Sequence, residues 1–152
     1  MSTYVPHPEW IVLEWHHACI EAGALCILRC TECSAWRHPP RRFCPQCFSD
    51  GAEFQPVSGR GRIITVSVSH RSRDPGWQER APYATLVIEL EEGQRVIAAT
   101  KSEPDDIVLG APVHVTIEPR ADDFVLVWAE IDPAGQQPAG HQEEEGVRAE
   151  QS

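Results

Sequence analysis

Cys30-Thr31-Glu32-Cys33 and Cys44-Pro45-Gln46-Cys47 are two C-x-x-C motifs, separated by the ten residues 34–43. Two such motifs at this separation can bring four thiolates to the corners of one tetrahedron. Zinc prefers this geometry and these soft ligands, and a site closed by four cysteines is structural and not catalytic. The spacer is shorter than the commonest zinc-ribbon spacing, but it fits two short hairpins held by one ion. The metal ligands predicted from the sequence are Cys30, Cys33, Cys44 and Cys47.

The four cysteines allow three other interpretations: a redox C-x-x-C pair, two disulfides and an iron centre. A redox site of the thioredoxin type needs one pair beside a βαβ pattern, and the sequence has no such pattern. An iron centre stays open, because four sulfur ligands in tetrahedral geometry suit both iron and zinc.

The length and composition predict one compact domain or two small ones. The chain has 152 residues, 41% of them hydrophobic, and no apolar run approaches the length of a transmembrane helix. Residues 1–9 lack the basic and apolar regions of a signal peptide. Six cysteines without a signal peptide indicate the reducing cytoplasm, where thiols bind metal instead of pairing. We expect the two remaining cysteines, Cys19 and Cys26, to be small buried hydrophobic residues.

The charge is unevenly distributed along the chain. The formal net charge is −10, yet residues 29–80 contain nine arginines against five acidic residues. A basic patch on an acidic protein indicates a local anion site. Twelve of the 13 basic residues are arginine, whose planar fork suits phosphate. A genome biased toward arginine codons would explain the choice of arginine over lysine, but not the clustering.

The N-terminal part predicts one amphipathic helix over Pro8–Gly23, with Gly23 as its stop. Its apolar stripe consists of Ile11, Trp15, Ala18, Cys19 and Ala22. His16 and His17 are adjacent on this helix, so they point about 100° apart and cannot chelate one ion together. We expect them to serve packing or an interface. A short strand over Leu25–Arg29 leads into the first C-x-x-C motif.

The segment between the two motifs, Trp36–Arg42, contains Pro39 and Pro40, which stiffen the backbone and remove donors. It is predicted to project as a rigid basic finger that contacts a ligand or a partner. An ordinary solvated loop is the alternative. The following segment, Phe48–Ser58, is predicted to be a linker that turns at Asp50-Gly51.

From Gly61 onward the hydrophobic period changes to two. The strands predicted from this pattern and its turns are 61–70, 83–90, 94–100, 112–118 and 124–131. Tight hairpins are expected at Glu92-Gly93 and Asp122-Asp123. A helical turn is expected at 103–106, between the third and fourth strands. Five strands with a helical turn in this place are typical of the OB-fold, a small, partly open barrel, although a five-stranded sandwich would show the same period.

Two further segments carry predictions of their own. Residues 70–82 form a long loop between the first two barrel strands, in which Pro75-Gly76 argues against a helix. Loops of this length in a small domain are usually functional or disordered. Residues 132–152 are rich in Gly, Pro, Gln and Glu, which predicts a flexible acidic tail. The expected division is therefore a helix over 1–24, a zinc ribbon over 25–57, an OB-fold over 58–131 and the tail.

At this point the sequence resembles a known family, the acyl-CoA-associated proteins that combine a zinc ribbon with an OB-fold and were long catalogued as a domain of unknown function. The resemblance covers about residues 8–130. The motifs that carry it are Leu28-Arg29-Cys30-Thr31-Glu32-Cys33, Trp36-Arg37-His38-Pro39-Pro40-Arg41, Cys44-Pro45-Gln46-Cys47, Ser58-Gly59-Arg60-Gly61, Pro82-Tyr83, Leu90-Glu91-Glu92-Gly93 and Glu103-Pro104-Asp105-Asp106-Ile107 with Gly110. One departure is Ser34-Ala35, where glycine commonly follows the second cysteine. The implied fold is mainly β with an N-terminal α-helix: a rubredoxin-like zinc ribbon followed by a five-stranded OB-fold barrel.

The resemblance implies a small, non-catalytic subunit of an acyl-CoA-processing complex. The implied partners are thiolase-fold enzymes, which include thiolases, acyl-transfer synthases and sterol-carrier-protein-type retro-aldolases of steroid side-chain degradation, and also MaoC-like hydratases. The residues agree in part, because arginine forks bind the phosphates of coenzyme A in a bidentate way. The arginines expected to contact CoA phosphates are Arg37, Arg41, Arg42, Arg71 and Arg73. The expected interface anchors are Trp10, Trp15, Trp77 and Trp128.

The sequence also bears on two other functions, an autonomous enzyme and a nucleic-acid-binding protein. An autonomous enzyme is disfavoured, because the sequence has no G-x-S-x-G elbow, P-loop, G-x-G-x-x-G or H-E-x-x-H motif. Zinc ribbons and OB-folds often bind nucleic acid, but the net charge of −10 and the few aromatic residues on the predicted strands oppose this function here. A free-standing acyl-CoA-binding or nucleic-acid-binding protein remains the alternative to the accessory subunit.

Overall fold

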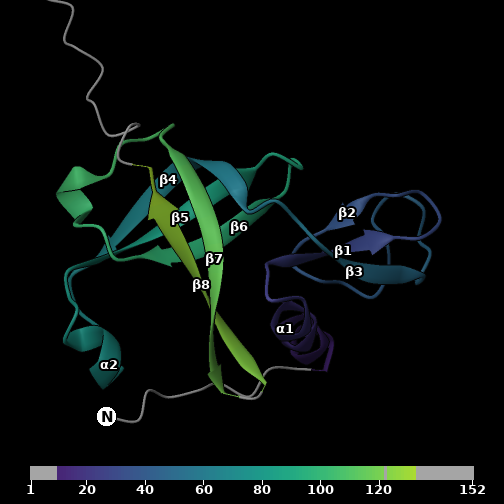
Figure 1. Ribbon diagram of the computed structural model, residues 1–152, viewed down its shortest axis with the longest axis horizontal. Coiled ribbons are helices and arrows are strands. Elements are labelled where there is room, and N and C mark those ends of the chain that lie inside the picture. Colours follow the sequence, from purple (N-terminus) through teal and green to yellow (C-terminus); the bar gives the residue numbers. More distant parts are fainter. Residues whose placement is uncertain (1–9, 122, 133–152) are drawn as a thin grey trace, which may run out of the picture.

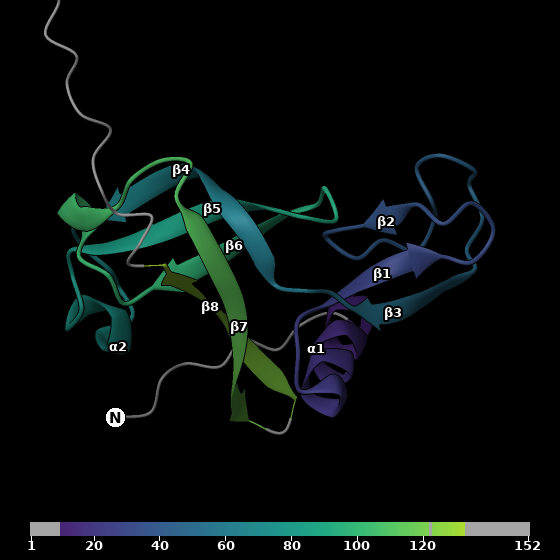
Figure 2. The same ribbon diagram turned by 45° about the horizontal axis from the view of Figure 1, so that its top comes forward.

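The computed structural model describes residues 10–121 and 123–132. It contains a three-stranded sheet in the order β2-β1-β3 and a closed barrel in the order β4-β5-β6-β8-β7. Figures 1 and 2 show the small sheet at one end of the molecule, the barrel at the other, and helix α1 beside the junction between them. Among the described residues, no helix has both the length and the hydropathy needed to cross a membrane.

Helix α1 spans Trp10–Ala22, as the hydrophobic period predicted, while the expected start at Pro8 lies outside the described residues. Gly23 ends the helix in the left-handed conformation, at a φ of 63°. The N–H of Gly23 donates to the carbonyl of Ile20, and the N–H of Ala24 donates to the carbonyl of Cys19. This pair of bonds is a Schellman motif, which satisfies carbonyls that a helix end leaves free.

Three side chains of α1 connect it to both sheets. Trp15 Nε1 donates to the carbonyl of Cys26 at 2.7 Å, and the backbone N–H of Cys26 donates to Cys19 Sγ at 3.3 Å. On the other side, the N–H of Val125 on the barrel donates to His16 Nδ1 at 3.2 Å. Cys19 and Cys26 are both buried, as expected. The helix therefore fixes the small sheet against the barrel.

The apolar stripe of α1 is confirmed in part. Trp15 and Cys19 are buried and Ile11 and Ala18 are half-buried, but Ala22 is exposed in the last turn. The two adjacent histidines differ in burial, and only His16 has the packing role that was expected. His16 is buried, with its ring centroid 4.6 Å from that of Phe124, whereas the neighbouring His17 is exposed.

The small sheet is formed by β1 (Cys26–Cys30), β2 (Trp36–Arg37) and β3 (Ala52–Pro56). Strand β1 lies in the centre and pairs antiparallel with both neighbours. Phe48–Ser58 was predicted to be a linker, and this prediction was wrong for residues 52–56, which form β3. Strand β3 pairs with the whole of β1, from Cys26 opposite Pro56 to Cys30 opposite Ala52. This pairing depends on a partner strand distant in sequence, which the short polar segment itself does not indicate.

The barrel confirms the five predicted strands and excludes the five-stranded sandwich. Its strands are β4 (Arg60–Ser69), β5 (Tyr83–Leu90), β6 (Arg95–Thr100), β7 (Pro112–Ala121) and β8 (Phe124–Ile131), with a 3-10 turn at Pro104–Asp106. A parallel pair between β6 and β8 and an antiparallel pair between β4 and β7 close the barrel. The expected turn before Phe124 follows from the pairing of Ala121 with Phe124, although Asp122 itself lies outside the described residues.

The barrel core follows the alternation of the strands. On β5, four alternate residues are at most 3% exposed: Ala84, Leu86, Ile88 and Leu90. Gly61 on β4 lies so close to this strand that a Cβ would be 2.5 Å from the carbonyl oxygen of Glu89. Only glycine allows this approach without moving the neighbouring backbone.

The loop at 70–82 contains a four-residue helix, α2 (Pro75–Gln78), so the argument against a helix was wrong. Proline suits the first helical position, because no intrahelical bond is lost there. The carboxylate of Asp74 caps the turn by accepting from the N–H groups of Gly76 and Trp77, at 2.9 and 3.2 Å. The sequence Asp-Pro-Gly-Trp therefore begins a helix, with Asp74 as its cap and Pro75 as its first residue, and this helix has only four residues.

Two of the expected interface anchors are core residues. Trp15 is 8% exposed and Trp128 is 4% exposed, so neither offers its ring to a partner. Trp77 is half-buried against Tyr83, with ring centroids 4.8 Å apart. Among the four tryptophans, Trp10 alone is largely exposed, at 58%.

The contact between His16 and the barrel predicts a pH-dependent stability. Burial lowers the pKa of His16, while Asp123 acts in the opposite direction and His17 adds to the lowering. The folded protein thus keeps His16 neutral, whereas the unfolded chain binds a proton near the ordinary pKa of 6.5. The free energy of unfolding should therefore fall as the pH drops below this value.

The variant His16→Asn keeps an acceptor near the position of Nδ1 but does not titrate, so its stability should depend less on pH between 7.5 and 5 than that of the wild type. Denaturant unfolding at several pH values measures this difference, with His17→Asn as the control that should keep most of the wild-type dependence, because His17 is the smallest of the three influences on the pKa of His16. His16→Ala should lose about 1–3 kcal/mol at pH 7.5, because the N–H of Val125 is left without an acceptor. Equal pH dependence in the wild type and His16→Asn would contradict this role of His16.

Candidate metal centre

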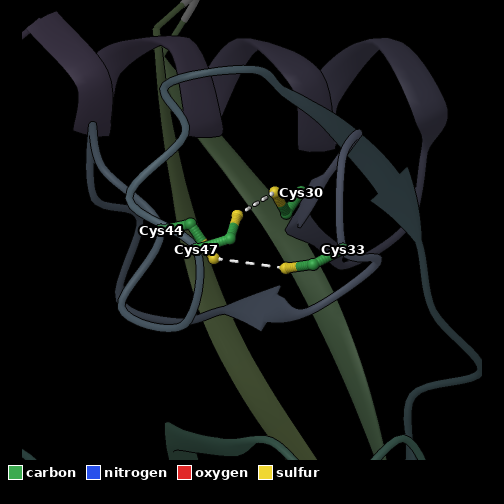
Figure 3. Close-up of side chains that lie close together, drawn as sticks. All are labelled: Cys30, Cys33, Cys44 and Cys47. Atoms are coloured by element: carbon green, nitrogen blue, oxygen red, sulfur yellow. Dashed lines mark hydrogen bonds between the residues drawn. The ribbon is translucent and has the colours of Figure 1, made fainter.

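Four cysteines converge beside the small sheet, and Figure 3 shows their sulfurs pointing toward one another. Cys30 is the last residue of β1, Cys33 lies in the turn that follows it, and Cys44 and Cys47 lie in the loop between β2 and β3. All four Sγ atoms lie within 4.8 Å of one another. The Sγ atoms of Cys30 and Cys47 are 3.6 Å apart, and those of Cys33 and Cys44 are 3.5 Å apart.

These distances fit a four-coordinate metal site. With zinc–sulfur bonds of about 2.3 Å, the sulfurs of a regular tetrahedron lie about 3.8 Å apart. The sulfurs are too far apart for disulfides, whose S–S bonds are about 2.05 Å, and all six cysteines are free thiols. The residues present therefore fit one zinc ion held by four thiolates. Such an ion would supply cross-linking and no chemistry, because no coordination position is left open.

The two C-x-x-C motifs adopt the same backbone geometry. The N–H of Ser34 donates to the carbonyl of Cys30 at 3.1 Å, and the N–H of Phe48 donates to the carbonyl of Cys44 at 2.9 Å. Ser34 and Phe48, which directly follow the second cysteines, both have a φ of 60°. Replacing glycine at this position costs roughly 1–2 kcal/mol per residue, but it leaves the turn unchanged.

The surroundings favour the thiolate form of the two buried sulfurs. The backbone N–H of Cys33 and the guanidinium of Arg37 both help to lower the pKa of Cys30, to about 6. The backbone N–H of Cys47 and then that of Gln46 lower the pKa of Cys44. Thiolates are the metal-binding form of cysteine, so these groups favour metal binding at Cys30 and Cys44. At Cys33 the backbone N–H of Ala35 acts in the same direction, but hydrogen bonds with the other sulfurs and burial raise the pKa to about 12.

Arg37 is placed differently from the expected basic finger. It lies on β2, is 2% exposed, and directs its guanidinium into the loop that carries the second C-x-x-C motif. The guanidinium donates to the carbonyls of Arg41, Arg42, Ser49 and Gly51. This arrangement does not fit a contact with CoA phosphate, because the side chain is buried and both Nη groups already donate inside the protein.

The other four predicted arginines are exposed and do not form one site. Arg41 and Arg42 line a groove of about 350 Å³ where α1 meets the small sheet, together with the exposed ring of Trp10. Arg71 and Arg73 directly precede α2, which lies at the opposite end of the molecule from the small sheet (Figures 1 and 2). The charge cluster in the sequence is thus divided between two surfaces.

Comparisons with known proteins follow the same division of the chain. A family described as "ChsH2, rubredoxin-like zinc ribbon domain" matches residues 21–53, and one described as "ChsH2, C-terminal OB-fold domain" matches residues 54–118. A DUF35 domain-containing scaffold protein of Methanocaldococcus jannaschii is 31% identical over 131 residues, which is 82% of this chain and 91% of the relative. The chain belongs to the DUF35 family.

Further relatives and structures agree with this assignment. A DUF35 scaffold protein of Methanothermobacter thermautotrophicus is 36% identical over 105 residues, covering 66% of this chain and 78% of the relative. A solved structure titled "Ltp2-ChsH2(DUF35) aldolase" matches with a TM-score of 0.72 and 28% identity, covering 82% of this chain and 97% of that one. A DUF35 protein of Sulfolobus solfataricus, at 12% identity and a TM-score of 0.51, shows the shared fold.

One aromatic cluster of this DUF35 chain was not foreseen as a cluster. Trp77 from α2 lies 6.1 Å from Trp128 of β8, measured between ring centroids. The cations of Arg80 and Lys101 lie 5.4 and 5.1 Å from the centroid of the Trp128 ring. These contacts fix α2 against the barrel. No sequence signal could have found the cluster, because its members come from three segments that only the closed barrel brings together: residues 77–80, Lys101 and strand β8.

The variant Cys44→Ser is expected to unfold the ribbon of this DUF35 protein and spare much of the barrel. Structural zinc binding is coupled to folding, with apparent free energies of roughly 10–16 kcal/mol in small peptides, whereas the five barrel strands pair only with one another. Hydrogen exchange measured by mass spectrometry should show lost protection in residues 26–56 and retained protection in residues 60–131.

Cys19→Ala is the matched control, since Cys19 is a buried thiol outside the four-cysteine cluster. It should keep one zinc per chain by elemental analysis. A freshly purified wild-type protein with neither zinc nor iron would overturn the metal site.

Proposed function

We propose that this chain is a non-catalytic accessory subunit of an acyl-CoA enzyme of the thiolase fold, which it stabilises and helps to bind its CoA thioester. The enzyme would be a thiolase, an acyltransferase or a retro-aldolase, acting on lipids or steroid side chains. The observation that carries the proposal is the likeness to the structure titled "Ltp2-ChsH2(DUF35) aldolase", because it extends over 97% of that chain and includes both domains. The relatives described as scaffold proteins support the same role.

The described residues support a role without chemistry of its own. Burial raises the pKa of Cys19 to about 12 and also raises that of Cys26, so neither thiol is a nucleophile at neutral pH. Burial lowers the pKa of two histidines, and both contact other side chains or backbone of the protein. His16 accepts a hydrogen bond from the barrel, and the ring centroid of His38 lies 6.0 Å from that of Trp15. The chemistry is therefore assigned to the partner.

The ribbon end of the molecule offers a surface suited to a protein partner. Three large side chains stand exposed there: Trp10 at 58%, Phe43 at 56% and Phe48 at 79%. Phe48 also occupies a left-handed backbone position that disfavours bulky residues. Arg42 lies over the ring of Phe43, 5.5 Å from its centroid. Aromatic residues with arginine are the composition of interface cores, so this end is assigned to the thiolase-fold partner or a MaoC-like hydratase.

The CoA thioester is assigned to the groove beside this surface. Arg41 and Arg42 line it with exposed guanidinium groups, which suit phosphate, and Trp10 offers a face on which an adenine ring can stack. Glu14 and Asp50 also line the groove and lower its net positive charge. Arg71 and Arg73, at the other end of the molecule, are a second candidate for phosphate contact.

Co-expression with the thiolase-fold proteins of the native host tests the assembly directly. A stable hetero-oligomer is expected, most simply two copies of each chain around the partner's own dimer axis. Phe48→Ser should weaken it several-fold in size-exclusion chromatography with light scattering, whereas Ile97→Ser, at a position on the barrel that is also largely exposed, should not. A stable monomer that binds none of these enzymes, or binds nucleic acid at low salt, would contradict the proposal.

The double variant Arg41→Ala/Arg42→Ala tests the ligand contact in the assembled complex. Each lost charge-assisted bond costs about 1.5–3 kcal/mol if desolvated, and less if exposed to salt. The loss should appear in KM and leave kcat nearly unchanged, because these contacts bind the ground state and the transition state alike.

The matched control is Arg71→Ala/Arg73→Ala, which separates the two candidate surfaces. If Arg41 and Arg42 instead contact the partner, the double variant lowers complex formation without any substrate present. Unchanged kinetics together with unchanged assembly would show that both arginines only face solvent.

A further inference from the structure

Arg37 is a buried arginine that has no carboxylate partner in the part of the chain that the structure describes. It is 2% exposed, and arginine is almost never buried to this degree unless its charge is paired. The ion pairs among the described residues join Arg60 to Glu91, Arg95 to Glu89 and Arg120 to Glu118. Arg37 takes part in none of them, so another group must compensate its charge.

The guanidinium joins both sides of the second C-x-x-C motif. Its Nη1 donates to the carbonyls of Arg41 and Arg42, at 3.4 and 2.9 Å, which precede Cys44. Its Nη2 donates to the carbonyls of Ser49 and Gly51, at 3.2 and 2.8 Å, which follow Cys47. The loop that carries two of the four sulfurs is therefore closed around one side chain.

The backbone of Arg37 belongs to the other half of the site. Strand β2 pairs with β1, with Arg37 opposite Leu28, two residues before the first ligand, Cys30. A single residue thus links the strand that carries the first motif to the loop that carries the second. The relative position of the two sulfur pairs depends on this link as well as on any ion.

The charge of the guanidinium lies beside the sulfurs. Nε of Arg37 is buried and has no hydrogen-bond partner, so the four carbonyls satisfy only the Nη groups. The sulfurs that interact with the guanidinium are those of Cys30 and Cys44, which become thiolates when they bind a metal. These are the two buried ligands, whereas Cys33 and Cys47 are exposed to water. Four thiolates and one divalent ion carry a net formal charge of roughly −2. Water can stabilise this charge at the exposed Cys33 and Cys47, but not at the buried Cys30 and Cys44.

We propose that Arg37 is the positioning residue and internal counter-cation of the metal centre. Its planar fork holds the second motif in register with the first, and its charge stabilises the two sulfurs that water does not reach. Lysine cannot replace it, because an ammonium group has three donors on a flexible stem and cannot bond to four carbonyls at once. The role is independent of the partner and ligand proposed above.

Competition with a zinc chelator, applied to the full-length protein, measures the first consequence. Arg37→Gln should bind zinc about 10–100-fold more weakly, the range found when outer-shell partners of metal ligands are removed. Arg37→Lys keeps the charge but loses the fork, so its affinity should lie between those of the wild type and Arg37→Gln. The matched control is Arg42→Gln, an exposed arginine of the same loop, which should keep the wild-type affinity.

Cobalt substitution gives a readout that a purely structural brace would not change. Removing a positive charge from beside two thiolates raises the energy of their electrons, so the sulfur-to-cobalt charge-transfer band of Arg37→Gln should move to longer wavelength. Arg37→Lys should move it less, and Arg42→Gln not at all.

Unchanged zinc affinity in Arg37→Gln would overturn the proposal. An unchanged band in the cobalt-loaded variants would overturn its electrostatic part. If Arg37→Gln loses the ribbon while hydrogen exchange shows an intact barrel, the predicted weakening is confirmed, provided that Arg42→Gln keeps its zinc. Loss of both ribbon and barrel in Arg37→Gln and Arg37→Lys would contradict a role confined to the metal centre.

Discussion

The convergence of four thiolates is the constraint on which the ribbon depends. Its sheet has only three strands, and β2 contains two residues, so backbone pairing alone supplies little stability. Units below about 40 residues usually need a metal, a disulfide or a partner chain to fold. The paired C-x-x-C turns and the enclosed guanidinium of Arg37 both act on the same result, which is four sulfurs within bonding distance of one ion.

Helix α1 extends this constraint to the rest of the molecule. One hydrophobic cluster contains Trp15 and Cys19 of the helix, Ile27 of the ribbon, and Ile63 and Val125 of the barrel. The ribbon is therefore packed as part of one core and is not tethered by a free linker. A consequence for function is that the exposed aromatic residues at the ribbon end are held in a fixed position relative to the barrel, as an assembly role requires.

Much of this fold could be predicted from the sequence, because its signals are local. Period-two alternation found the five barrel strands, and the two C-x-x-C motifs found the metal site from spacing alone. Strand β3 and the burial of Arg37 could not be predicted in this way, since both depend on a partner supplied by β1 or by the loop at 41–51. Trp128 was expected to be an interface anchor, but its ring is buried. This burial could not be predicted either, because it depends on the closed barrel and on α2 packing against it.

X-ray absorption spectroscopy of the purified protein at the zinc edge tests the central claim most directly. Four sulfur neighbours at about 2.3 Å, with no nitrogen or oxygen in the first shell, are expected if the two motifs close one structural site. An iron edge in place of zinc would keep the site and change the metal. A first shell that contains nitrogen or oxygen, or a protein with neither metal and two disulfides, would contradict the account.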